Sequence, residues 1–289
     1  MRNQPGQILD YSGWIQRVRS FPTELGFEPP TLVHKPHWCP YCRQEAGNPI
    51  IGMRSDKSQA EPSEHASRHD HPWHSFTAYI CETCGWWNLG LMNFESGPHG
   101  DCNEANYRAV LRSYAVQDLN LPIEALRQAL STRPQVIFGI NDRKMEQLVA
   151  DVLRDYIPGS EVSVCGKSGD GGIDLIMVAH EVPFAVQVKR RTRPGSVERV
   201  DAVRAFLGAS LLRGFDHLMY VTTADHFTGG PYGAETAAEV AKRRRLVREF
   251  HLIDRNRLFA MLRLVTTGRA RTWERLLPPI LQDLGFEEP

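Results

Sequence analysis

The sequence predicts an α/β protein: an α/β sandwich with a central mixed sheet, preceded by a small cysteine-bearing module. Two observations support this division. From residue 141 onward, segments with the 3.6-residue period of helices alternate with short apolar runs typical of strands, in the order helix, three strands, helix, strand. Between residues 36 and 102, two Cys-x-x-Cys pairs flank a polar tract that has no apolar periodicity.

The elements of the second part follow in order. Asn141 or Asp142 can cap a helix whose apolar residues recur at i, i+3 and i+4 spacing, and Pro158-Gly159 ends it. Strands are expected at about 161–166, 172–180 and 183–190, and a helix is expected over roughly 196–213. A strand at 217–222, a helix near 234–248, a short strand at 251–254 and a helix at 258–264 complete the pattern.

The first part is less regular. Residues 1–35 are predicted to be an irregular lead-in with a short amphipathic piece around Trp14–Phe21. Residues 107–116 fit either a strand or a short helix. A helix then begins at Pro122, with proline in its first turn and Pro134 beyond its end. This helix is interpreted as part of a connector between the two parts.

Composition limits the classes of function. The 289 residues carry a formal net charge of zero, which argues against a protein that coats nucleic acid nonspecifically. Basic residues do cluster at 189–193 and 242–245, where they either form solvated faces or meet phosphates. The sequence has no apolar run of membrane-spanning length and no visible secretory signal, so a cytoplasmic location is expected. Cysteines in that compartment are better explained by metal than by disulfides.

Four of the six cysteines have the spacing of a metal site. Cys39 and Cys42 form one pair, and Cys81 and Cys84 form the second after 38 intervening residues. Four thiolates are the tetrahedral set that structural Zn²⁺ prefers, and Gly85 follows the second pair where a tight turn often needs positive φ. The pattern therefore predicts a zinc ribbon, with the polar tract inserted between its two knuckles.

Other interpretations of this module stay open. A redox Cys-x-x-Cys fits poorly, because there are two such pairs and no thioredoxin-like pattern. Histidines of the polar tract offer further metal ligands, although histidines in a polar loop are more often solvated. Trp86 and Trp87 belong either to the core of the ribbon or to an exposed base-stacking surface. The histidines concerned are His65, His69, His71 and His74.

A second constellation lies between residues 143 and 190. Asp174 follows a glycine run, and the strand FAVQVKRR places Gln187 and Lys189 on one face, because side chains on a strand alternate. An antiparallel return through a turn at 180–183 brings Gln187 close to Asp174. Carboxylate, amide and carbonyl oxygens, here including the carbonyl of Val188, are hard ligands suited to Mg²⁺.

These residues indicate metal-dependent cleavage of a phosphodiester. That reaction needs a divalent cation at the phosphate and a positive group that neutralises developing charge. Lys189 would orient the attacking water and stabilise the transition state, and Glu146 could bind a second metal or a metal-bound water. Asp170 is a rival to Asp174, but in the sequence GDGG it more readily shapes the turn.

The same stretch resembles the PD-(D/E)xK nuclease superfamily and, within it, the Mrr-like restriction endonucleases. The matching motifs are Met145-Glu146 in a helix, Gly169-Asp170-Gly171-Gly172-Ile173-Asp174-Leu175, and Val186-Gln187-Val188-Lys189-Arg190, with further matches at 221–228 and 252–254. Glutamine in place of glutamate departs from the wider superfamily but not from the Mrr-like branch. The resemblance covers roughly residues 141–264. It implies a restriction-endonuclease-like sandwich acting on double-stranded DNA, often foreign or modified DNA, in defence.

The expected organisation then has five parts. These are an N-terminal lead-in at 1–35, a zinc ribbon with an inserted polar loop at 36–103, a connector strand and helix at 104–135, an Mrr-like nuclease domain at 136–267, and a C-terminal tail at 268–289. Cleavage of two strands by an enzyme with a single site makes a homodimer plausible. The alternatives are a DNA-repair or junction-processing nuclease, an inactive nuclease fold kept for binding, and a noncatalytic zinc-ribbon adaptor.

Overall fold

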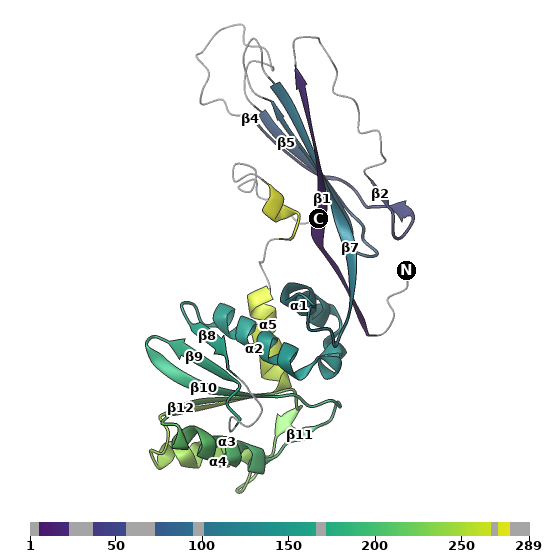
Figure 1. Ribbon diagram of the computed structural model, residues 1–289. Coiled ribbons are helices and arrows are strands. Elements are labelled where there is room, and N and C mark those ends of the chain that lie inside the picture. The colour runs from purple at the N-terminus through teal and green to yellow at the C-terminus, as the bar shows by residue number, and fades with distance from the viewer. Residues whose placement is uncertain are drawn as a thin grey trace. The chain divides into compact units, whose positions relative to one another are not determined.

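A computed structural model describes residues 6–22, 37–55, 73–94, 101–165, 172–266 and 271–277. The chain divides into two compact units (Figure 1). Unit 1 comprises residues 1–3, 9–113 and 270–289, and unit 2 comprises residues 4–8 and 114–269. Three separate segments of the sequence therefore make up unit 1.

Unit 2 is built on a five-stranded mixed sheet. Its strands lie in the order β14 (Glu249–Ile253), β12 (His217–Thr222), β10 (Val182–Lys189), β9 (Leu175–Ala179) and β8 (Glu161–Val164). The strands β8, β9 and β10 pair antiparallel, whereas β10, β12 and β14 pair parallel. The predicted mixed sheet is confirmed. The three parallel strands all end at one edge, where loops can carry functional side chains.

Helices cover both faces of this sheet (Figure 1). Alternation along β10 and β12 explains the two layers, because Val186 and Val221 pack into one apolar core while Ala185 and Tyr220 pack into the other. The first core is closed by α1 (Ile123–Thr132), α2 (Asp142–Tyr156) and α5 (Arg255–Thr266), and the second by α3 (Val200–Leu212) and α4 (Ala234–Arg243). No helix among the described residues is long and apolar enough to cross a membrane.

Most predicted elements of unit 2 are confirmed. Asn141 caps α2 by accepting a hydrogen bond from the Arg143 amide at 2.9 Å. The turn between β9 and β10 has positive φ at His180 and Glu181, as a tight two-residue hairpin requires. Two boundaries are wrong by four or more residues. The helix expected from 196 begins at Val200, because β11 (Val197–Glu198) pairs with β13 (His226–Phe227), and the helix expected to reach 248 ends at Arg243. A 3₁₀ helix, η3 (Pro134–Gly139), links α1 to α2.

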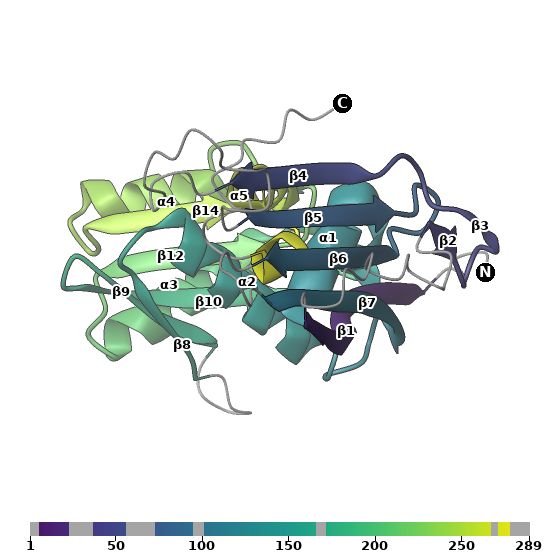
Figure 2. The same ribbon diagram turned by 90° about the horizontal axis from the view of Figure 1, so that it is seen from above.

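Unit 1 contains a second five-stranded sheet. Its order is β1 (Gln7–Pro22), β7 (Asp101–Ala115), β6 (Trp87–Phe94), β5 (Trp73–Ile80) and β4 (Ile50–Ser55), as Figure 2 shows. The expectation of an irregular lead-in is wrong for residues 7–22, which form the longest strand. The choice between strand and helix at 107–116 is settled in favour of a strand, since β7 runs from 101 to 115.

One face of this second sheet carries the core of unit 1. Phe76 and Leu89 are buried there, and Trp273 packs with its ring 6.2 Å from that of Phe76. Trp273 precedes a short 3₁₀ helix, η4 (Glu274–Leu276), so this part of the expected C-terminal tail belongs to the folded core. A small hairpin of β2 (Trp38–Cys39) and β3 (Gln44–Glu45) completes the unit.

Candidate active site and metal centre

Asp174 is anchored across the hairpin of β9 and β10. Its amide donates to the carbonyl oxygen of Val186 at 2.9 Å, and its Oδ2 accepts a hydrogen bond from the amide of Val188 at 2.7 Å. The register pairs Leu175 with Val186, and Asp174 just beyond that pair bonds to the residues on either side of Gln187. The structure therefore brings together three of the predicted ligand residues, Asp174, Gln187 and Val188.

The side-chain amide oxygen of Gln187 is buried without a hydrogen bond among the described residues. Such an atom is costly unless it has a partner of another kind, because a buried acceptor loses its water without compensation. The same side chain crowds Gly172, where an added Cβ would lie 2.7 Å from the amide nitrogen of Gln187. Gly172 also has a φ of +85°. A side chain at this position would therefore strain the backbone as well as displace the Gln187 amide.

Lys189 ends β10 at the edge where the parallel strands finish. It lies opposite Thr222 of β12, and its carbonyl accepts a hydrogen bond from the amide of Thr223 at 3.1 Å. Its side chain is exposed and shares a strand face with Gln187. The exposed lysine and the buried amide oxygen of Gln187 therefore belong to one face at the end of β10.

Arg190 ties the helix that carries Glu146 to the end of β10. Arg190 directly follows β10; its Nε donates to the Asp142 carboxylate and its guanidinium also contacts the Phe138 carbonyl at 3.3 Å. Asp142 begins α2, and Glu146 lies one turn later on the same side of that helix. The contact of Arg190 with Asp142 thus ties the end of β10 to the helix turn that carries Glu146. The ion pair was not foreseen from the sequence, where Arg190 was assigned only to a basic cluster.

The comparisons bear on this domain. Residues 139–262 match the family model Mrr_cat, which is described as a restriction endonuclease. These residues form an Mrr-type restriction endonuclease domain. The match confirms the resemblance stated from the motifs, and it covers less than half of the chain, so it assigns unit 2 and leaves unit 1 unassigned. The comparison with curated proteins found no match.

The Mrr-type domain carries a buried ionic network next to Lys189. Glu198 is fully buried; it accepts hydrogen bonds from both Nε and the terminal nitrogen of Arg191, from Tyr220 Oη at 3.1 Å and from Thr222 Oγ1 at 2.8 Å. Thr223 Oγ1 then binds both the amide and the carbonyl of Arg191. Because Arg191 stands two residues after Lys189, this network fixes the chain just beyond the end of β10.

This network changes the interpretation of the first basic cluster. Arg190 and Arg191 are engaged with protein carboxylates, whereas Lys189 and Arg193 are exposed. Two of the four cations therefore stabilise the fold of the site. The available signal in the sequence was the acid Glu198 shortly after the basic cluster. Nothing in the spacing identified Arg191 as its partner.

The four cysteines of unit 1 converge on one point. The sulfur atoms of Cys39, Cys42, Cys81 and Cys84 all lie within 4.8 Å of one another, and Cys39 and Cys84 are 3.6 Å apart. A tetrahedral metal with bonds of about 2.3 Å to sulfur separates its ligands by roughly 3.8 Å, so this cluster has the dimensions of a metal site. All four are free thiols, which excludes disulfides between them in this structure.

The two knuckles have matching backbones. The amide of Arg43 donates to the Cys39 carbonyl at 2.9 Å, and that of Gly85 donates to the Cys81 carbonyl at 2.7 Å. Arg43 and Gly85 both have positive φ, as predicted for Gly85. Burial raises the pKa of Cys39 to about 11, and burial with the neighbouring thiols of Cys84 and Cys81 raises the pKa of Cys42 as well. Four thiolates this close repel one another, so they are stable together only beside a cation.

The remaining sequence interpretations divide into three groups. Trp86 and Trp87 are buried in the core of unit 1, and their indole nitrogens donate to the Ala109 and Tyr11 carbonyls, so they are not an exposed stacking surface. His74 lies on β5 with its Nδ1 3.0 Å from Asn93 Oδ1 and outside the cysteine cluster. His65, His69, His71 and Asp170 lie outside the described residues.

Proposed function

We propose that unit 2 is a metal-dependent endonuclease that hydrolyses phosphodiester bonds of double-stranded DNA. One observation carries the proposal: the buried Oε1 of Gln187 has no hydrogen-bond donor among the described residues, and Asp174 bonds to the residues on either side of Gln187. An oxygen donor set of this kind suits a hard divalent cation, and Mg²⁺ is the expected one. The family match supports a restriction-endonuclease-like nuclease.

The residues divide the work as follows. Asp174 and Gln187 would hold the cation with the Val188 carbonyl, and Glu146 would bind a second cation or an ordered water. When bound, the cation polarises the scissile phosphate and lowers the pKa of water near it. Lys189 orients the attacking water and offsets the negative charge that develops on the phosphate oxygens. The hydrogen bond from Val188 to Asp174 orients the carboxylate at the end of the hairpin.

For unit 1 we infer a structural zinc ribbon. Four thiols at the spacing observed fill every position of a tetrahedral site, so the site has no open position for catalysis. The cysteine cluster supports this assignment by its donor set and dimensions. Zinc would then stabilise the fold of the module, which would engage DNA or a protein partner.

The biological role proposed is restriction of foreign or modified DNA in defence, in the cytoplasm. This rests on the restriction-endonuclease family of unit 2 alone. A panel of methylated, unmethylated and branched DNA distinguishes restriction from repair: preferential cleavage of branched substrates would favour a junction-processing enzyme.

The test of the nuclease assignment is cleavage of supercoiled plasmid with Mg²⁺ and with EDTA. We expect nicking or linearisation only with Mg²⁺, and we expect Asp174→Asn to lower the rate by a factor of about 10² or more, because it removes a charged ligand. Asp201→Asn on α3 is the matched control, since Asp201 is exposed and its ion pair among the described residues is with the exposed Arg199. Equal activity of wild type and Asp174→Asn would refute the site assignment.

A further inference from the structure

Strand β1 is an edge strand whose middle, from Trp14 to Val18, is weakly protected against pairing, since Asp10, Arg19 and Pro22 lie nearer its ends. It stands at the end of the unit 1 sheet, with β7 on one side and no strand of the described chain on the other (Figure 2). An edge strand leaves a row of backbone N–H and C=O groups unpaired, and proteins normally block such an edge with charges, proline or a covering segment. Between Trp14 and Val18 the only charged residue is Arg17.

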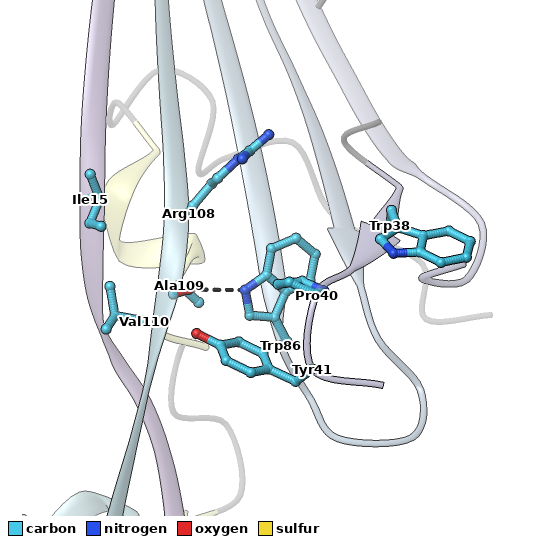
Figure 3. Close-up of a pocket in the computed structure, with 8 residues that line it drawn as sticks. All are labelled: Ile15, Trp38, Pro40, Tyr41, Trp86, Arg108, Ala109 and Val110. Atoms are coloured by element: carbon cyan, nitrogen blue, oxygen red, sulfur yellow. Dashed lines mark hydrogen bonds between the residues drawn. The ribbon is translucent and has the colours of Figure 1, made fainter. Parts of the chain in front are cut away.

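Both faces of this edge strand are apolar. Trp14 is 45% exposed and Val18 59% exposed, and both lie on one face; Ile15, 61% exposed, lies on the other. On the face of Ile15, the strand borders a hollow of about 530 Å³ whose wall includes Tyr41, Trp86 and Val110 (Figure 3). The wall is fixed in place, because Trp86 donates to the Ala109 carbonyl and Tyr41 Oη accepts from the Leu111 amide.

The opposite edge of the sheet differs. Strand β4 is six residues long, and its exposed apolar residues, Ile51 and Met53, share a single face. Between them Gly52 lies against Phe76, where an added Cβ would lie 2.2 Å from the ring. Of the two described edges of this sheet, β1 is the one that combines an open edge with apolar side chains on both faces. A strand that continues the sheet gives neighbours to both faces, whereas a nucleic acid would contact one face and leave the apolar side chains of the other exposed.

We propose that β1 is a dimerisation edge, which pairs antiparallel with β1 of a second copy of this chain and joins the two unit 1 sheets. In a two-fold antiparallel pair each residue faces its partner across the axis. The pairing centred on Gln16 sets Trp14 opposite the second copy's Val18, an aromatic and β-branched pair that stabilises sheets. It also sets Arg17 opposite Ile15 and so keeps the two guanidinium groups apart. This interface does not depend on the nuclease proposal.

The first test measures the mass of the full-length, metal-loaded protein without DNA by sedimentation equilibrium at micromolar concentrations. We expect a dimer for wild type, and we expect Trp14→Lys and Val18→Lys to raise the dissociation constant by a factor of about 10 or more, since each change occurs twice in the interface. Met53→Lys on β4 is the matched control and should stay dimeric. A monomeric wild type, or variants of β1 that dimerise like wild type, would overturn the proposal.

A cross-linking test covers the case in which a lysine variant fails to fold. Gln16→Cys places a thiol next to its own copy across the proposed axis, so mild oxidation should give a covalent dimer. Met53→Cys and wild type, which retains its native cysteines, set the background. Cross-linking of Gln16→Cys no greater than that of Met53→Cys would overturn the proposed pairing.

Discussion

At the scale of single residues, the site depends on side-chain contacts that the sequence could only partly predict. The glycine run, the spacing to Q-x-K and the glutamate in the first helix were enough to select Asp174, Gln187 and Lys189. The role of Gly172 was not visible, because a glycine-rich turn leaves open which glycine meets a side chain. Nor could spacing reveal that Arg190 pairs with Asp142 and Arg191 with Glu198, since those contacts depend on tertiary structure.

Gly172→Ala tests the fit around Gln187. The new Cβ would lie 2.7 Å from Gln187 Nε2, and a φ of +85° costs a non-glycine residue roughly 1–2 kcal/mol, so both stability and cleavage should fall. Gly159→Ala is the matched control, because Gly159 has a φ of +78° with no atom within 4 Å of the added Cβ. Urea unfolding should show a similar loss for both, with cleavage lowered only in Gly172→Ala. Equal cleavage by the two variants would contradict the proposed contact.

At the scale of secondary structure, regular amphipathic elements were predictable and edge elements were not. Helix α2 shows a clear 3.6-residue period because one side packs on the sheet, and β12 matches its predicted range of 217–222. Strand β1 was missed because its exposed half is apolar on both faces and shows no alternation. The segment around Trp273 was missed for another reason: a single buried tryptophan in a short 3₁₀ turn has no periodicity to detect.

The cysteine knuckles give a prediction at this scale. One zinc should be bound per chain, and Cys42→Ser should abolish it, because structural zinc contributes on the order of 10 kcal/mol or more of apparent binding free energy. Cys165→Ser is the control, since Cys165 belongs to unit 2 and is not part of the cysteine cluster of unit 1. Elemental analysis of freshly purified, reduced protein measures the outcome. Wild-type protein without zinc, or Cys42→Ser protein with one zinc per chain, would refute the zinc ribbon.

At the scale of the whole molecule, the division into units revises which fragment should fold. The nuclease domain was expected to start at residue 136, but α1 packs in the same core as α2. Leu126 and Leu130 are buried there, and the buried guanidinium of Arg127 donates to Asp151 and Asp155. A fragment that lacks α1 leaves those carboxylates without their partner and opens the core.

We therefore expect residues 114–269 to unfold cooperatively in urea and to retain Mg²⁺-dependent cleavage. A fragment of residues 136–289 should be less stable by several kcal/mol, because each large buried side chain removed costs about 2–5 kcal/mol. Equal midpoints and slopes for the two fragments would show that α1 is dispensable. If the 114–269 fragment and the full chain cleave a DNA panel with identical rates and preferences, unit 1 does not read DNA and a protein partner is favoured.

The central claim is that the end of β10 performs phosphodiester hydrolysis, and single-turnover cleavage by Lys189→Ala tests it most directly. DNA binding measured with Ca²⁺ in place of Mg²⁺ serves as the check on folding and affinity, and Lys242→Ala, an exposed lysine on α4, is the matched control. The account predicts that Lys189→Ala binds DNA like wild type but cleaves more slowly by a factor of about 10²–10³, with Lys242→Ala unchanged. Cleavage by Lys189→Ala at the wild-type rate would contradict it.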